Sequence, residues 1–200
     1  MMAGKKQETR VDEGRLIERA RQGDADAFAR LYRANVQAIY RYIYHRVNDT
    51  HLAEDLTGDV FVRALKGMAA YQERGKPFVA WLYRIAHARV VDYYRQTSRR
   101  PVESDIEIEP IPVGADMDRS LLRRQAARTL REAIARLTDE QQQVIVLRFI
   151  EGHSLETTAQ IMGKNANAIK ALQHRALRAL AGRLSRAGFD VEAILSGLSS

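Results

Sequence analysis

The chain has 200 residues, of which 46% are hydrophobic, so it can bury a packed core and disorder throughout is excluded. It has no cysteine, which excludes disulfides and thiolate metal sites and fits a reducing compartment, and its net charge of +7 favours an anionic partner. Neither a signal peptide nor an apolar run near the roughly 20 residues of a spanning helix is evident, so we expect a soluble, cytoplasmic protein without membrane insertion.

Apolar residues recur at helical spacing through the first half of the chain, and no segment alternates as a strand would. The predicted helices span residues 12–22, 24–47, 50–66 and 77–100. Asp24 is expected to cap the second helix, and Asn48 to end it. The stretch 71–77 is predicted as a loop because Gly75 and Pro77 interrupt the pattern.

The composition changes after residue 100. Residues 101–118 combine prolines with six acidic and no basic side chains, so the rest of the chain carries a net charge of +13. A polyanionic partner would explain this basic body, and so would a solvated arginine-rich surface. The segment predicts an acidic flexible linker.

Helical spacing resumes near Leu121, and a capping box over Thr138–Gln141 predicts a further helix that Gly152 closes. The fold class is therefore all-α. The predicted organisation is a helical domain over 11–100, the linker over 101–118, a second helical domain over 119–186 and a short tail over 187–200.

Residues 154–180 carry the clearest local signal. Ser154 and Asn165 can each cap a helix, and Gly163 lies between the two helices where the chain must turn. A helix, a tight turn and a second helix form the arrangement that places the second helix in the DNA major groove. The predicted outer face of the second helix offers donors for phosphates and base edges, and an ordinary hairpin with a polar face is the alternative. Those donors are Asn167, Lys170, Gln173, His174, Arg175 and Arg178.

A basic and aromatic helix covers residues 81–100. It holds five arginines and one acid, with aromatic residues between them. Rings that stack on bases and arginines that follow the backbone suit single-stranded or opening DNA. Core packing of Trp81 and some tyrosines is the alternative.

The patterns of catalytic sites are missing. The five histidines are far apart in the sequence, so we expect no metal and no cofactor. Gly75-Lys76 lacks the spacing of a phosphate loop, and no nucleophile has a base beside it. We therefore expect a protein that is not an enzyme.

Taken together, the two halves resemble the extracytoplasmic-function (ECF) sigma factors, over about residues 11–185. In the first half the resemblance is carried by Asp26-Ala-Phe28, Leu31-Tyr32, Ala53–Thr57, Asp59–Phe61, Arg63-Ala64, Phe78–Ala86 and Asp92. In the second half it is carried by Leu137-Thr138, Gln142–Ile145, Leu147-Arg148, Glu151-Gly152, Ala159, Met162-Gly163, Ile169-Lys170 and His174–Ala176.

The resemblance implies three sites, for polymerase and for the −10 and −35 promoter elements. The third predicted helix would bind the β′ clamp helices of the RNA polymerase core through Asp55, Asp59, Phe61 and Arg63. The −10 element would be bound and opened by Tyr71, Lys76, Trp81, Arg84, His87, Arg89 and Arg95. The −35 duplex would be read by Asn165, Asn167, Ala168, Lys170, Ala171, His174, Arg175 and Arg178. The expected partners are the polymerase core, including its β flap, promoter DNA and an anti-sigma factor.

Two departures from the family pattern affect promoter choice. Ala88 stands where many relatives have asparagine in the −10 helix. Ala168 and Ala171 replace hydroxyl residues and favour apolar contact with a thymine methyl group. The alternative function is a stand-alone helix-turn-helix regulator, which would need neither the polymerase-binding helix nor the strand-opening helix.

Overall fold

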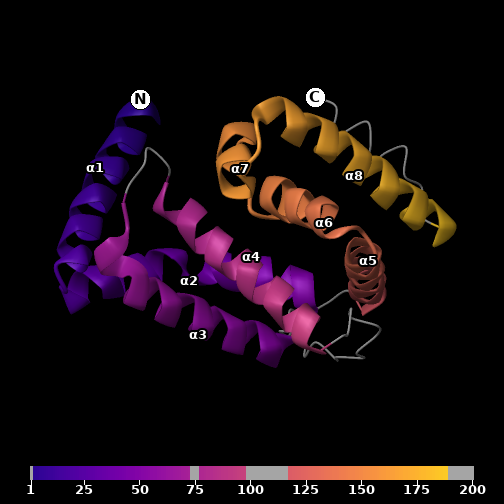
Figure 1. Cartoon of the computed structure of the whole chain (residues 1–200). Coiled ribbons are helices and arrows are strands. Elements are labelled where there is room, and N and C mark those ends of the chain that lie inside the picture. Colours follow the sequence, from indigo (N-terminus) through magenta and orange to yellow (C-terminus); the bar gives the residue numbers. More distant parts are fainter. Residues whose placement is uncertain (1, 73–76, 98–116, 189–200) are drawn as a thin grey trace.

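The computed structural model describes residues 2–72, 77–97 and 117–188, and all regular structure in these ranges is helical (Figure 1). The elements are α1 (Met2–Arg21), α2 (Ala25–Val47), α3 (Thr50–Gly67), the 3₁₀ turn η1 (Met68–Ala70), α4 (Phe78–Thr97), α5 (Met117–Ala135), α6 (Asp139–Ile145), the π-helical turn η2 (Val146–Ile150), α7 (Leu155–Met162) and α8 (Ala166–Arg186). The all-α prediction is confirmed.

Helices α1 to α4 form the first unit, with α2 in contact with α1, α3 and α4. Asp24 caps α2 by accepting a hydrogen bond from the Ala27 amide, and Asn48 ends it with a left-handed φ of 54°. Ile39, Ile43 and similar side chains are fully buried between the helices. Each such side chain contributes about 1.5–3 kcal/mol by leaving water.

Helices α5 to α8 form the second unit, and they surround a smaller core that includes Ile134, Val144, Ile169 and Leu172. Its helix ends follow from local sequence, because polar side chains occupy the capping positions. The capping box predicted at Thr138 is present, with the Gln141 side chain accepting from the Thr138 amide at 3.2 Å.

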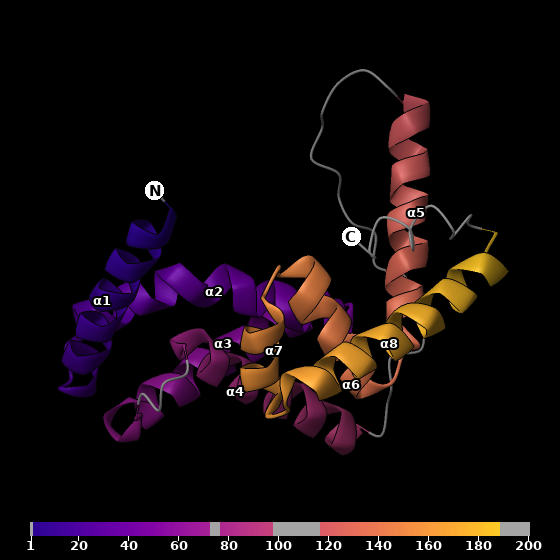
Figure 2. The ribbon, with the colours of Figure 1, turned by 90° about the horizontal axis from the view of Figure 1, so that it is seen from above.

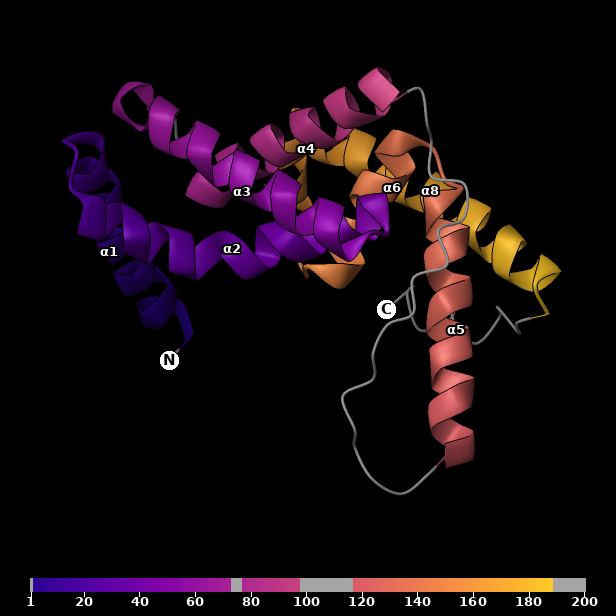
Figure 3. The same ribbon diagram turned by 90° about the horizontal axis from the view of Figure 1, so that it is seen from below.

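The two units lie side by side. Helix α7 is in contact with α4, and α2 is in contact with α5 and η2. Figures 2 and 3 show α5 standing out from the other helices at its N-terminal end. The apolar core of the first unit continues into the second, because Val146, Leu147 and Ile161 are buried within it.

Three predicted boundaries differ from the structure. Helix α1 begins at Met2 rather than near residue 12, because the added residues include lysine, glutamine and glutamate, which favour helix without an apolar stripe. Helix α5 begins at Met117, inside the segment predicted as linker. The helix expected to continue to Gly152 changes to a π-helical turn at Val146. The remaining predicted linker and residues 189–200 of the tail lie outside the described residues.

Candidate nucleic-acid interface

Helices α7 and α8 form the predicted pair joined by a tight turn. The Ser154 hydroxyl caps α7 by accepting from the Thr157 amide at 3.1 Å. Gly163 ends α7 with a φ of 65°, where glycine avoids the strain of a side chain. Asn165 then caps α8 by accepting from the Ala168 amide at 2.8 Å. The unpaired amides at the start of α8 give this end a partial positive charge that attracts phosphate.

The outer face of α8 carries most of the residues predicted to read the −35 element. Ile169, Leu172 and Ala176 point into the core, which fixes the opposite side as the solvent face. The exposed residues of this face are Asn167, Lys170, Ala171, His174, Arg175 and Arg178. Ala168 is half-buried, and the exposed Asn165 uses its side-chain oxygen for the cap.

Gln173 does not join this face. It is half-buried, and its side-chain oxygen accepts a hydrogen bond from Arg148 Nε at 3.0 Å. Arg148 also donates to the carbonyl of His153 in the turn before α7. Sequence reasoning missed this clamp because Arg148 lies in the π-helical turn, which no local pattern predicted.

Helix α4 presents two exposed arginines of the −10 prediction, Arg84 and Arg95. Arg89 is held at the surface instead, because Asp59 of α3 accepts from its Nη2 at 2.7 Å and Asp92 lies 3.5 Å from its Nη1. The predicted polymerase-binding and −10 sites are therefore joined by an ion pair between Asp59 and Arg89.

The aromatic residues expected to stack on bases form a cluster at the start of α4. Tyr71 is buried and its ring centroid lies 4.6 Å from that of Trp81 and 5.4 Å from that of Phe78. A Cβ at Gly67 would lie 3.2 Å from Trp81, so glycine makes room for the indole. In this arrangement the Tyr71 ring supports the core and offers no open stacking face. Lys76 lies outside the described residues.

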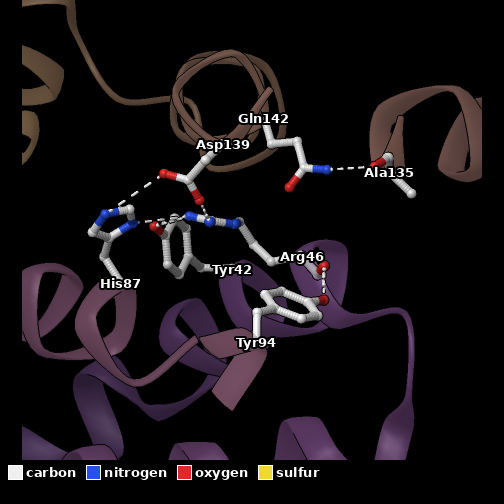
Figure 4. Close-up of polar contacts among 7 residues, drawn as sticks. All are labelled: Tyr42, Arg46, His87, Tyr94, Ala135, Asp139 and Gln142. Carbon is white, nitrogen blue, oxygen red and sulfur yellow. Dashed lines mark hydrogen bonds and ion pairs between the residues drawn. The ribbon is translucent and has the colours of Figure 1, made fainter. Parts of the chain in front are cut away.

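His87 lies where the two units meet (Figure 4). Its Nδ1 is 3.1 Å from Arg46 Nη1, and its Nε2 is 3.7 Å from the carboxylate of Asp139. Burial, and secondly the Arg46 charge, lower the pKa of His87 below its usual value. In this arrangement His87 is directed at α6 and the second unit.

Helix α3 exposes Asp55, Asp59 and Arg63 as expected. Phe61 is 5% exposed, and its ring packs edge-on against Tyr32 at a centroid distance of 4.8 Å. The prediction that Phe61 binds polymerase is therefore at odds with its place in the core. Phe61 lies on the same apolar stripe of α3 as Val60 and Ala64, and this stripe packs against the core. Its ring therefore points inward, away from the surface where polymerase would bind.

Two exposed apolar residues of α3 were missed. Val62 and Leu65 are 51% and 55% exposed, and they continue the surface that begins with Asp55 and Asp59. The signal was available in the sequence, because both residues fall outside the apolar stripe that packs the core.

The described ranges were also searched for metal-binding clusters and for helices that could cross a membrane. No group of three or more histidine or acidic side chains there could hold a metal ion. Within residues 2–72, 77–97 and 117–188, none of the helices is long and apolar enough to cross a bilayer.

Comparisons with known proteins match both units. The Sigma-70 region 2 model matches residues 31–100, and the Sigma-70 region 4 model matches residues 133–181. The chain is 33% identical over 177 residues to the ECF RNA polymerase sigma factor ShbA of Streptomyces griseus, covering 84% of this chain and 92% of ShbA. The chain belongs to the ECF family of RNA polymerase sigma factors.

A second ECF sigma factor, BldN of Streptomyces coelicolor, is 41% identical over 167 residues, which cover 83% of this chain and 63% of BldN. Two solved structures share the fold. CnrH, in complex with the cytosolic domain of CnrY, has a TM-score of 0.65 at 23% identity and covers 88% of this chain and 98% of its own. RpoE of Bartonella quintana has a TM-score of 0.63 at 21% identity and covers 79% of this chain and 96% of its own.

The resemblance to ECF sigma factors predicted from sequence is thus confirmed, and with it a role in transcription initiation. The region 2 match includes most of α2 and all of α3 and α4, and the region 4 match includes α6, α7 and most of α8. Both matches fall inside the predicted domains 11–100 and 119–186. The exact domain limits and the individual site residues stay predictions.

Proposed function

We propose that this ECF sigma factor divides initiation between its two units, over the predicted domains 11–100 and 119–186. The exposed side of α3, with Asp55, Asp59, Val62 and Leu65, binds the β′ clamp helices of core polymerase. Helix α4 and the segment before it open the −10 element, with Arg84 and Arg95 on the DNA backbone. The chain acts in the cytoplasm and contributes no covalent chemistry of its own.

The observation that supports DNA binding is the outer face of α8. A capped helix start attracts phosphate, and Lys170, Arg175 and Arg178 follow at positions that reach one groove. Ala171, exposed between them, offers a methyl group for van der Waals contact with thymine. Such a face reads duplex DNA through base edges while the arginines hold the backbone.

The alternative of a stand-alone operator-binding regulator explains this face equally well. It does not explain why Val62 and Leu65, two large apolar side chains of α3, are exposed to solvent. Exposed apolar residues that lie together indicate a protein-binding surface. A polymerase-binding sigma factor accounts for both surfaces.

An anti-sigma factor completes the proposed set of partners. The similar RpoE structure was solved in complex with the anti-sigma factor NepR. We expect the same class of partner for this chain, bound where it competes with polymerase or DNA.

The experiment that tests the proposal is transcription in vitro with purified core polymerase and a library of genomic fragments. New start sites that share two upstream elements are the expected result. A second sigma factor supplied to the same core controls for its activity. If that control initiates and this chain gives no start sites, the operator-binding alternative replaces the proposal.

A further inference from the structure

Arg148 joins three elements of the second unit through its guanidinium group. It lies in the π-helical turn η2, and its Nε donates to the side-chain oxygen of Gln173 on α8 at 3.0 Å. Its Nη1 donates to the carbonyl of His153, in the turn that leads into α7. One side chain therefore links η2 both to α8 and to the start of α7.

The π-helical turn explains how Arg148 reaches α8. A π-helix pairs residues five apart rather than four, and such turns are frequent at functional sites. Val146 and Leu147 stay buried in η2, while the next residue extends toward α8. The turn is itself fixed, because the amides of Glu151 and His153 donate to the carbonyls of Val146 and Leu147, each at 2.9 Å. Arg148 thus extends from a fixed base.

Gln173 borders the outer face of α8, which carries the proposed DNA contacts. Lys170 precedes it by three residues, so these two side chains are neighbours on the helix surface. His174 and Arg175 follow it directly in the sequence, and both are exposed. A shift of α8 at Gln173 would therefore move the side chains that are proposed to read the −35 duplex.

Apolar packing alone defines the position of α8 less sharply. Ile169, Leu172 and Ala176 face the core, and the burial of such side chains is a non-directional force. A guanidinium group is planar and donates in fixed directions, so its hydrogen bonds set both a distance and an angle. The bonds of Arg148 fix α8 relative to the turn before α7, where apolar contacts alone would allow small slides and rotations.

Direct contact with DNA suits Arg148 less well than this internal role. Its Nε and Nη1 already donate within the protein, and the residue is half-buried. Breaking two internal hydrogen bonds would offset the gain from a phosphate contact. Lys170 and Arg175 lie on the outer face itself, and no such bond is recorded for either within the described ranges.

We propose that Arg148 is a positioning residue for −35 recognition, which acts through Gln173 and His153 to hold α8 where its outer face can discriminate between base pairs. The inference rests on the proposed function for the DNA that is read, and on the hydrogen bonds alone for the position of α8. Without the clamp, the charges that bind phosphate are still in place, so non-specific binding persists. The preference for the correct −35 sequence falls, because base contacts need a defined geometry.

Two conservative substitutions test the clamp. Arg148→Lys keeps the charge but loses the planar donors, and Gln173→Leu removes the acceptor while keeping a similar size. Fluorescence anisotropy measures the affinity for a labelled duplex with the −35 element mapped by transcription, and for the same duplex with that element scrambled. The ratio of the two affinities is expected to fall about fivefold or more in each variant, which is the effect of losing at least one base contact.

Further variants separate positioning from a direct contact. If Arg148 acts through Gln173, the double variant loses no more than Arg148→Lys alone. Gln173→Glu keeps an acceptor for Arg148 and is expected to retain the ratio. Because a lysine can still bind a phosphate, a normal ratio in Arg148→Lys together with weaker overall binding in Arg148→Gln would show a direct phosphate contact and overturn the proposal.

Arg186→Lys is the matched control. Arg186 also donates through its Nε, to the carbonyl of Gly182 at 2.9 Å, but this bond lies within α8, more than two turns after Gln173. The ratio should be unchanged in this variant. Circular dichroism confirms that each variant is folded, and if one of the two test variants does not fold, the other carries the test. An unchanged ratio in a folded test variant would overturn the proposal.

The position of α8 can also be measured without DNA. Glu156→Cys on α7 and Ser185→Cys on α8 lie at exposed positions of a chain that has no cysteine, and each takes a spin label. The distribution of distances between the labels should broaden in Arg148→Lys, and an unchanged distribution would count against the clamp. If the unmodified chain shows no −35 preference, the proposed function fails, whereas this measurement still decides whether Arg148 positions α8.

Discussion

The polar residues predicted to contact DNA differ in whether their side chains already form hydrogen bonds or ion pairs within the protein. Gln173 and Arg89 were predicted to contact DNA, yet Gln173 accepts a hydrogen bond from Arg148 and Arg89 pairs with Asp59. Lys170 and Arg175 are exposed on α8, and no hydrogen bond or ion pair is recorded for either within the described ranges. The donors of Lys170 and Arg175 can therefore exchange water for a phosphate or a base edge without breaking a hydrogen bond inside the protein.

We therefore predict that Lys170→Ala and Arg175→Ala each weaken binding to promoter duplex that carries the −35 element. A contact to a base edge contributes about 1–3 kcal/mol, so roughly a fivefold loss or more is expected where the residue reads a base. Fluorescence anisotropy with labelled promoter DNA measures the change. Arg186→Ala, at the far end of α8, is the matched control, and unaltered affinity in both test variants would contradict the assignment.

At the scale of helices and turns, the sequence predicted what short-range chemistry decides. The caps at Asp24, Ser154 and Asn165 and the left-handed turn at Gly163 lie where they were expected. The π-helical turn was not predicted, because its cause is distant in sequence. Val146 and Leu147 are drawn into the core of the first unit while Arg148 holds the second. Phe61 is a different case, because its burial follows from the apolar stripe that it shares with Val60 and Ala64, which the sequence already contained.

Helix α3 gives a prediction of its own. Val62→Ser and Leu65→Ser together should lower affinity for core polymerase, because they remove apolar area from the proposed docking surface and little from the core. A loss of about fivefold or more is expected, which corresponds to about 1 kcal/mol or more. Pull-down with tagged core measures it, and Leu130→Ser, another exposed leucine, is the control. Native retention of the folded double variant would remove α3 from the polymerase site.

For the molecule as a whole, the contact between the units includes histidines, His87 and His153, whose pKa burial lowers below the usual value. Burial lowers the pKa of His153 below its usual value, while the nearby Glu151 opposes the shift more weakly. Tyr83 and Arg41 face the same turn from α4 and α2. Because His153 binds a proton more readily when the two units are apart than when they are in contact, the stability of the contact is complete above about pH 6.5 and is lost as pH falls through the lower pKa.

The chain has no cysteine, so Ala34→Cys on α2 and Ser185→Cys on α8, both at exposed positions, can carry a donor and an acceptor dye. We expect the efficiency of energy transfer between these dyes to fall on acidification below about pH 6.5, before carboxylates protonate near pH 4. His153→Gln should shrink this pH dependence, since glutamine keeps a hydrogen-bonding group without titrating there. His51→Gln is the control, because that side chain is 95% exposed and away from the contact. A pH profile identical in the His153 variant and in the unmodified chain would exclude His153 as its source.

The shared core has a consequence for synthesis on the ribosome. Helix α4 is complete at Thr97, but α7, which brings Ile161 to its place, is complete only at Met162. The 65 residues between these points take roughly 3–13 seconds at about 5–20 residues per second. During that interval the newly made N-terminal half presents an apolar face that its own later sequence will cover. A nascent chain of this protein therefore exposes this face for seconds before its second half can cover it.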